Sequence, residues 1–322
     1  MRTVQPLEPP AVPRLLRLRT MELEGRTPAD VARAAKAGRL QRVIRGTYVE
    51  EPTSDAASRL VARAYASAPR LLPGMVFSHT TAAMLHGLTR DERIVGTALH
   101  ISRPGADGGW SRGDREVHAT RLGPDDVTAD PLPMTALART VVDCARTLPF
   151  DQAVTVADRA LRSDRRPEEI RLAMARVAER LRGCKGIERA RRVIAFADPG
   201  AANGGESAVR VALHVLGLPA PIVQYRVTDP SDPYFEAFAD LGWPDMRTLL
   251  EFDGVVKYRA GNPSGRPGHE VLVAEKRRED RLRALGWQVV RVVWADLRRP
   301  DRIAAQLRQA FARGTRWPRL QG

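Results

Sequence analysis

The chain has 322 residues, 43% of them hydrophobic, which is enough for two or three domains that each bury a core. Its formal net charge of +14 favours a polyanionic partner, although an arginine-rich solvated surface would carry the same charge. The sequence contains no apolar run long enough for a transmembrane helix and no secretory leader, so we expect a cytoplasmic protein with no membrane partner. Cys144 and Cys184 form no motif and are expected to be buried free thiols.

The composition changes along the chain and predicts three blocks in a multidomain α+β protein. The blocks span residues 1–52, 53–197 and 198–322, and the middle one is rich in helix-forming residues. The small, polar and glycine-rich stretch 198–205 predicts the joint before the third block.

The first block has the helix-start, helix-stop and turn signals of a small winged helix-turn-helix. An early helix is predicted within residues 14–25, and a second helix begins after the N-cap Thr27, with Pro28 in its first turn. Gly38 ends that helix, and residues 40–49 then show the pattern of a two-stranded ribbon with a tight turn.

The basic residues of this block predict how it would contact DNA. The second helix would enter the major groove with Arg33 and Lys36, and the ribbon would present Arg39, Arg42 and Arg45. The alternative is that all five cations belong to solvated faces. We favour contact with phosphates and the groove.

Residues 25–49 resemble the amino-terminal domain of AbiEi-type antitoxins, the regulator half of type IV toxin–antitoxin systems. The segments 77–88, 98–105 and 133–162 are similar to the region that follows this domain in actinobacterial relatives, which makes the second block an AbiEi-like middle domain. The resemblance implies autoregulation by DNA binding and a cognate toxin as a partner.

The histidines of the second block offer one candidate pair. His79 and His86 lie seven residues apart and would share a helix face, but two histidines without further ligands make a poor metal site. We interpret both as structural. His100, His118 and His214 are isolated in the sequence, and no role is assigned to them.

The third block predicts an α/β mixed sheet with a helix on either side. A helix at 204–216 precedes a strand at 221–227, and a further pair of strands is joined by the turn Trp243-Pro244-Asp245. A charged amphipathic helix at 269–285 follows. The last strand, within 287–297, is nearly all apolar and is expected to be buried on both faces.

Carboxylates converge in this predicted sheet. Glu251 and Asp253 alternate with an aromatic residue and point to one face, and the turn would bring Asp240 beside Glu251. Carboxylates gathered at a strand end need a cation or a retained proton, and Mg²⁺ or Mn²⁺ would suit such ligands and activate water at a phosphate. Glu206 would add a ligand or orient a metal-bound water.

Lys257 follows the acidic pair and would act on the attacking water or the scissile phosphate. The alternative is that Asp253 and the glycine after it form an ordinary turn, and that the acids pair with arginines. Arg277, Arg278 and Arg281 are expected to form a solvated or phosphate-facing surface.

Residues 203–298 resemble the PD-(D/E)XK nuclease superfamily, in particular the very-short-patch-repair-like endonucleases. The likeness implies a restriction-endonuclease-like fold, and it is carried by Glu206, Asp240, Glu251 and Asp253 with the closing helix and strand. The superfamily motif ends in acid-x-Lys, whereas this chain has Glu251-Phe252-Asp253 and its lysine four residues later.

Two functions therefore remain open. The first is a Mg²⁺-dependent DNA endonuclease in which Asp240 and Glu251 hold the metal, Asp253 assists or replaces the motif lysine and Lys257 acts on the phosphate. The second is an AbiEi-like transcriptional regulator whose nuclease-like domain is inactive. DNA is the expected partner under both functions.

Overall fold

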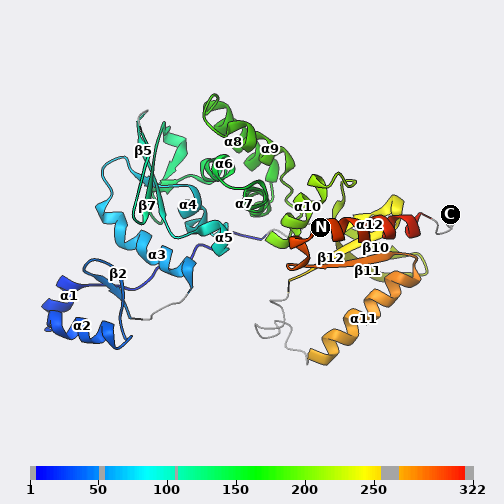
Figure 1. Cartoon of the computed structure of the whole chain (residues 1–322), viewed down its shortest axis with the longest axis horizontal. Helices are drawn as coiled ribbons and strands as arrows, with labels where there is room; N and C mark the ends of the chain where they lie inside the picture. Colours follow the sequence, from blue (N-terminus) through cyan, green and yellow to red (C-terminus); the bar gives the residue numbers. More distant parts are fainter. Residues whose placement is uncertain (1–4, 51–54, 106–107, 255–267, 316–322) are drawn as a thin grey trace. The chain divides into compact units, whose positions relative to one another are not determined.

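A computed structural model describes residues 5–50, 55–105, 108–254 and 268–315 (Figure 1). The described chain is mixed α/β, contains three sheets and forms two compact units that divide between Ala197 and Asp198. The second unit begins where the third block was predicted to begin, and the first unit holds both earlier blocks. Within the described residues, we find no helix with the length and apolar character needed to cross a membrane.

The amino-terminal part of the first unit contains two helices and a three-stranded sheet in the order β1-β3-β2. Thr27 and Asp30 form a reciprocal capping box at the second helix, which satisfies backbone groups at the helix start. Met21, Val31 and Leu40 form the core. The elements are β1 (Leu15–Arg17), α1 (Leu18–Leu23), α2 (Pro28–Lys36), β2 (Gln41–Ile44) and β3 (Thr47–Val49).

A six-stranded sheet follows, in the order β6-β7-β5-β4-β9-β8. The expectation of a helix-rich block did not include this sheet, because several of its strands have only two or three residues and give little periodicity. Its elements and first helices are α3 (Ala56–Ser67), β4 (Val76–Phe77), α4 (His79–Leu85), α5 (Glu92–Val95), β5 (Leu99–Pro104), β6 (Trp110–Arg112), β7 (Arg115–Thr120), β8 (Val127–Thr128) and β9 (Met134–Thr135).

Four helices complete the first unit, and the first of them carries a buried ion network. Arg139 donates to Asp126 at 3.0 Å and to Asp143 at 2.9 Å, with its side chain only 1% exposed. Both thiols are free, as predicted. Cys144 is buried, whereas Cys184 is exposed, so the prediction of burial was wrong for Cys184. The helices are α6 (Leu137–Thr147), α7 (Phe150–Arg162), α8 (Pro167–Arg180) and α9 (Ile187–Phe196).

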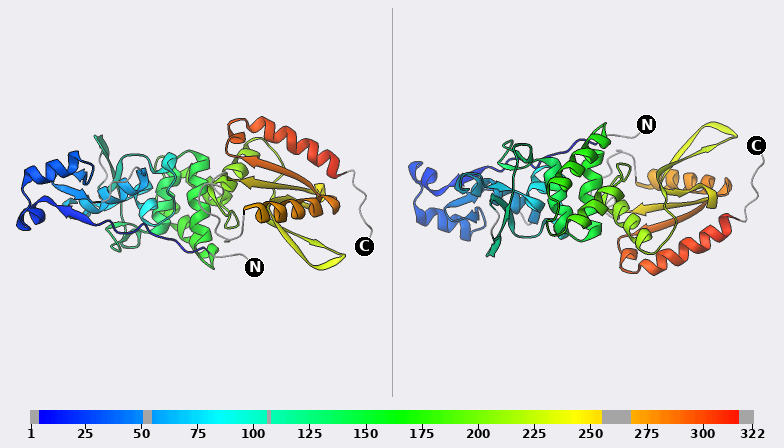
Figure 2. Two further views of the ribbon diagram at one scale, coloured as in Figure 1. Left: turned by 90° about the horizontal axis from the view of Figure 1, so that it is seen from below. Right: turned by 90° about the horizontal axis from the view of Figure 1, so that it is seen from above.

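The second unit is a four-stranded mixed sheet in the order β10-β11-β12-β13, with helices on both faces (Figure 2). The first three strands pair antiparallel, and β13 pairs parallel to β12 after the α11 crossover. One core lies between the sheet and α10 with α12, and a second core includes Leu282 of α11. The elements are α10 (Gly204–Val215), β10 (Ile222–Asp229), β11 (Asp232–Trp243), β12 (Thr248–Asp253), α11 (Gly268–Ala284), β13 (Gln288–Val293) and α12 (Pro300–Gly314).

The predicted order of elements is present in this unit, with three differences. β11 extends to Trp243, the first residue of the predicted turn. β13 was expected to be buried on both faces, but it is an edge strand in which Val292 is buried and Arg291 is exposed. α12 was not predicted, and it covers the sheet face shared with α10.

Candidate functional site

The start of α10 is held close to β12 by a glycine. A Cβ on Gly205 would lie 2.0 Å from Cε1 of Phe252, so only glycine allows this approach. The Asn203 side chain caps the helix by accepting from the backbone N–H groups of Gly205 at 2.8 Å and Glu206 at 3.1 Å. This local structure places the Glu206 carboxylate, only 2% exposed, near the sheet.

Two of the predicted acids meet at a glutamine. The side-chain amide of Gln224 donates to Oε2 of Glu206 and to Oδ1 of Asp240, both at 3.3 Å. Oδ2 of Asp240 accepts the backbone N–H of Phe252 at 2.7 Å. The structure thus brings Glu206 and Asp240 together on either side of one amide group, which we call the carboxylate cluster (Glu206, Gln224 and Asp240).

Gln224 occupies an unusual backbone conformation for a strand. Its φ is +51°, although it lies between the regular antiparallel pairs Val223–Leu241 and Tyr225–Ala239. A non-glycine residue at positive φ carries a conformational penalty, and such strain persists where surrounding contacts hold it, often at functional sites. Its two carboxylate acceptors are contacts of this kind.

Glu251 makes different contacts. As predicted, it and its neighbour Phe252 face opposite ways: Phe252 packs in the core with α10 and α12, while Glu251 turns to α11. Arg278 of α11 donates to Glu251 at 2.5 Å, and Arg291 of β13 lies 3.7 Å from it. Asp253 is half-buried at the end of β12. Lys257 lies outside the described residues.

The predicted metal ligands are therefore not gathered in one group. Among the described residues, no three acidic side chains bring their ligand atoms within 4.8 Å of one another. Glu206 and Asp240 share an amide donor, whereas Glu251 is engaged by arginines. Metal binding by Glu206, Asp240 and Glu251 stays a prediction.

The arginines of α11 are engaged in ion pairs rather than only solvated. Arg278 pairs with Glu251, as described above, and Arg281 pairs with Asp229 and Asp232, both at 2.8 Å. The Glu251–Arg278 pair is the alternative in which the acids pair with arginines, and a solvated or phosphate-facing role of this surface stays a prediction.

The predicted DNA-contacting cations are all available at the surface of the first unit. Arg33 also forms an ion pair with Asp30 in the first turn of α2, and this hydrogen bond contributes to a lowering of the pKa of Asp30 to about 2, behind the hydrogen bonds from Thr27. The exposed residues are Arg33, Lys36, Arg39, Arg42 and Arg45.

A pocket of about 380 Å³ lies beside the ribbon, between it and the end of α3. Its lining includes one acid, Glu22, and four arginines, so it is strongly cationic. Arg70 donates to the backbone carbonyl of Arg45 at 3.2 Å and connects the two sides of the pocket. The arginines are Arg17, Arg19, Arg45 and Arg70.

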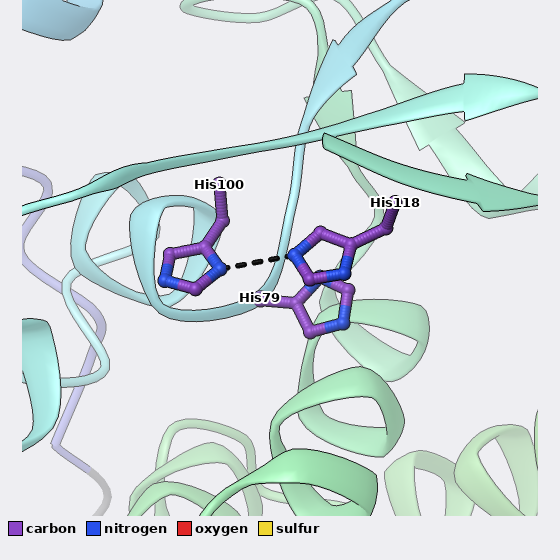
Figure 3. Close-up of side chains that lie close together, drawn as sticks. All are labelled: His79, His100 and His118. Atoms are coloured by element: carbon purple, nitrogen blue, oxygen red, sulfur yellow. Dashed lines mark hydrogen bonds between the residues drawn. The ribbon is translucent and has the colours of Figure 1, made fainter. Parts of the chain in front are cut away.

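His79, which was interpreted as structural, lies together with His100 and His118, to which no role was assigned (Figure 3). Ligand atoms of His79, His100 and His118 all lie within 4.8 Å of one another, so the interpretation of His100 and His118 as isolated was wrong. His86, considered as a partner of His79, instead donates from Nε2 to the carbonyl of Thr135 at 2.8 Å. We call the first three residues the histidine cluster.

The fold and these sites define a two-unit mixed α/β protein with a basic surface, a carboxylate cluster and a histidine cluster. The chain is 34% identical over 229 residues to "Uncharacterized protein Rv2248" of Mycobacterium tuberculosis strain ATCC 25618 / H37Rv and to "Uncharacterized protein MT2308" of strain CDC 1551 / Oshkosh. The match covers 70% of this chain and 78% of each relative, and the chain belongs to the family of these mycobacterial proteins. No family model matches the chain.

Proposed function

We propose that this protein binds DNA through its amino-terminal winged helix-turn-helix and cleaves it through a PD-(D/E)XK endonuclease-like second unit that uses Mg²⁺ or Mn²⁺. The observation that carries the proposal is the approach of Glu206 and Asp240 to a single point, the Gln224 amide nitrogen, at 3.3 Å each. Acidic side chains from a first helix and a central strand are the groups that the resemblance assigns to the metal.

The topology of the second unit supports the same assignment. The order α10, three antiparallel strands, α11 and a parallel closing strand is the αβββαβ order that led to the resemblance. The strands β11 and β12 place Asp240 and Glu251 on neighbouring strands near one end of their short ladder. Site geometry, and not the fold alone, must carry an activity.

The carboxylate cluster suggests how a cation would enter. The Gln224 amide donates hydrogen bonds to two carboxylates, which is the electrostatic role that a bound cation would take over. Rotating that amide by half a turn would present its carbonyl oxygen, itself a ligand suited to Mg²⁺. When bound, the metal would polarise a phosphate oxygen and lower the pKa of a water molecule.

Glu251 would join the site only after exchanging a partner. Its carboxylate is neutralised by Arg278 at 2.5 Å, and that guanidinium would be free to meet a DNA phosphate once Glu251 turns to a metal. Arg278 would then supply a cation where the motif lysine is missing, with Lys257 as the second candidate. Asp253 would assist at the end of β12.

The exposed cations of the first unit support binding to DNA. Five of them lie on α2, the turn after it and the ribbon, and three further arginines line the neighbouring pocket together with Arg45. Phosphate contacts of this kind position a helix on the duplex and make affinity depend on salt. Autoregulation beside a cognate toxin is what the AbiEi-like resemblance adds.

The test is nicking of supercoiled plasmid by the purified full chain in Mg²⁺ or Mn²⁺, with EDTA as the reference. We expect Asp240→Asn and Glu251→Ala to lower the cleavage rate by at least ~100-fold. Asp245→Asn is the matched control, because Asp245 is exposed in the turn at the far end of the same strands. Equal cleavage by wild type and both site variants would refute the assignment.

A second function is favoured by the state of Glu251. Its ion pair with Arg278 and its proximity to Arg291 would be stable in a domain that has lost its metal, as in a regulator that keeps the nuclease fold for contact with DNA or protein. Salt-sensitive DNA binding without cleavage in either metal would favour this regulator over the nuclease.

A further inference from the structure

The histidine cluster is built by sheet pairing rather than by a local motif. β5 and β7 pair parallel, with His100 opposite Glu116 and Ser102 opposite His118. Side chains alternate along a strand, so these four residues share one face while Ile101 and Val117 enter the core on the other. His100 and His118 are thus diagonal neighbours on a face turned away from the apolar core.

β4 brings the third histidine to the same place. It pairs antiparallel with β5, and the backbone N–H of Ser78 donates to the carbonyl of His100 at 3.0 Å. The next residue, His79, starts α4 with a φ of +50° and is only 4% exposed. A histidine at positive φ is held there by its surroundings, which is typical of residues fixed for a function.

The three rings form a tight stack. The centroids of His79 and His118 are 3.8 Å apart, and Nδ1 of His100 lies 3.0 Å from Nε2 of His118. Two imidazole nitrogens on a tetrahedral zinc ion with bonds of about 2.0–2.1 Å lie about 3.3 Å apart. The His100–His118 nitrogens are therefore already near the separation of a shared metal, as Figure 3 shows by their facing edges.

The surroundings keep the rings in the form that binds metal. Burial lowers the pKa of both His100 and His118 to about 4. Burial, the neighbouring rings and the α6 arginines lower that of His79 well below its usual value. Neutral imidazole is the ligand form, so protons would not compete near pH 7. One ring donates and the other accepts in the His100–His118 hydrogen bond, so both facing nitrogens could bind a metal once the donating ring carried its proton on its other nitrogen.

Some charged groups near the histidine cluster repel a cation and others attract it. Arg139 and Arg146 of α6 act against a cation, but both are paired with the buried Asp143, at 2.9 and 3.3 Å. Glu116 lies 3.5 Å from Nδ1 of His100 and offers a negative charge and a further oxygen ligand. The field at the cluster therefore does not exclude a divalent ion.

An unsatisfied hydroxyl lies beside the rings. Oγ of Ser102 is buried and has no hydrogen-bond partner among the described residues, and Ser102 is the residue opposite His118. A buried polar group without a partner calls for a bound water or ion. A metal-bound water on this face would supply one.

We propose that His79, His100 and His118 bind a divalent transition metal of the zinc class, with Glu116 or water completing its coordination. Three neutral imidazoles select zinc, cobalt or nickel over Mg²⁺, which prefers oxygen ligands. The site is distinct from the carboxylate cluster in residues and in chemistry, and it does not depend on the proposed nuclease function. A three-histidine set that leaves a position for water is also the form of catalytic rather than structural zinc sites.

The test is titration of the chelator-treated full chain with Zn²⁺ by calorimetry and with Co²⁺ by visible absorption. We expect one equivalent to bind and Co²⁺ to show the bands of a low-coordinate nitrogen site. His100→Gln and His118→Gln should each weaken binding by at least ~10-fold. His214→Gln is the matched control because His214 lies on α10 in the other unit, and it should bind like wild type.

Zinc X-ray absorption on the wild-type protein keeps the proposal falsifiable if the variants do not fold. A first shell dominated by imidazole nitrogen supports the site, and a shell of oxygen or sulfur overturns it. Absence of Zn²⁺ and Co²⁺ binding by folded wild type, or equal binding by folded cluster variants, would also overturn it. Asp240→Asn must retain the one equivalent.

Discussion

The histidine cluster of the first unit and the carboxylate cluster of the second unit differ in how far they are ready for a metal. The histidines are neutral, stacked and within 4.8 Å of one another; Nδ1 of His100 contacts Nε2 of His118, and Nδ1 of His79 lies 3.0 Å from the Ser78 hydroxyl. The acids already have other partners: Glu206 accepts from the Ala202 N–H and the Asn203 amide at 2.7 Å, Gln224 donates to both Glu206 and Asp240, and Arg278 pairs with Glu251. A neutral ligand set can wait preassembled, whereas carboxylates without a cation repel and take other partners.

Ligand type alone therefore does not define a metal site, because other protein groups compete with the metal for each ligand side chain. Before Glu206, Asp240 and Glu251 can bind one cation, the Gln224 amide must rotate and the Glu251–Arg278 ion pair must break. The histidine cluster needs the movement of one proton.

The largest effect is expected at the ion network behind the histidine cluster. Arg139→Ala would remove the guanidinium shared by the buried Asp126 and Asp143 and leave each with one arginine partner (Arg180 and Arg146), which we expect to lower the free energy of unfolding by about 3–5 kcal/mol. Urea unfolding followed by fluorescence and circular dichroism measures this. The exposed Arg176 of α8 provides a control, and Arg176→Ala should change stability by no more than ~0.5 kcal/mol. A similar small change for Arg139→Ala would contradict the account of α6.

The next effect concerns the close approach that positions Glu206. Gly205→Ala would place a methyl group 2.0 Å from the Phe252 ring, and we expect a loss of about 1–3 kcal/mol in unfolding free energy. Gly254→Ala is the matched control, because its Cβ would meet the same ring at an ordinary 3.8 Å. Thermal melts of the two variants should separate clearly. Equal stability would show that α10 is not held against β12 as described.

Removing Arg278, which competes with a metal for Glu251, should strengthen metal binding by the acids of the second unit. Arg278→Ala takes away a positive charge 2.5 Å from the carboxylate, and a Coulomb interaction of about 1 kcal/mol corresponds to about fivefold tighter binding of Mn²⁺. Paramagnetic relaxation of water protons by Mn²⁺ reports this affinity. Binding that weakens instead would mean that Arg278 supports the site rather than blocking it.

The smallest effect is expected for single phosphate contacts. Lys36→Ala and Arg42→Ala should each reduce the slope of log affinity against log salt by about 0.9, because each removes one cation from the predicted DNA surface. Fluorescence anisotropy with a labelled duplex at several salt concentrations gives the slope. Arg192→Ala, an exposed arginine of α9, should leave it unchanged.

Local signals allowed part of the fold to be predicted. Local signals mark the start of α2 at Thr27 and Pro28 and the turn at Gly46. Both α2 and the ribbon can therefore be predicted from neighbouring residues alone. The order of elements in the second unit follows from periodicity and turns in the same way. Such features need no knowledge of distant contacts.

The parts that could not be predicted depend on pairing between distant segments. Apolar–polar alternation at 99–102 and 116–118 does place His100 and His118 off the core face, but only the parallel β5–β7 register makes them neighbours. Arg278 lies 27 residues from Glu251, and no local pattern reveals that ion pair. The short strands β4, β8 and β9 give too few residues for a period.

A crossed titration with two metals distinguishes the two proposed sites. Zn²⁺ and Mn²⁺ binding would be measured on wild type, His118→Gln and Asp240→Asn under the same conditions. The account predicts that His118→Gln loses Zn²⁺ and keeps Mn²⁺, and that Asp240→Asn loses Mn²⁺ and keeps Zn²⁺. Loss of the same metal in both variants, or of neither metal in either, would contradict two chemically distinct sites.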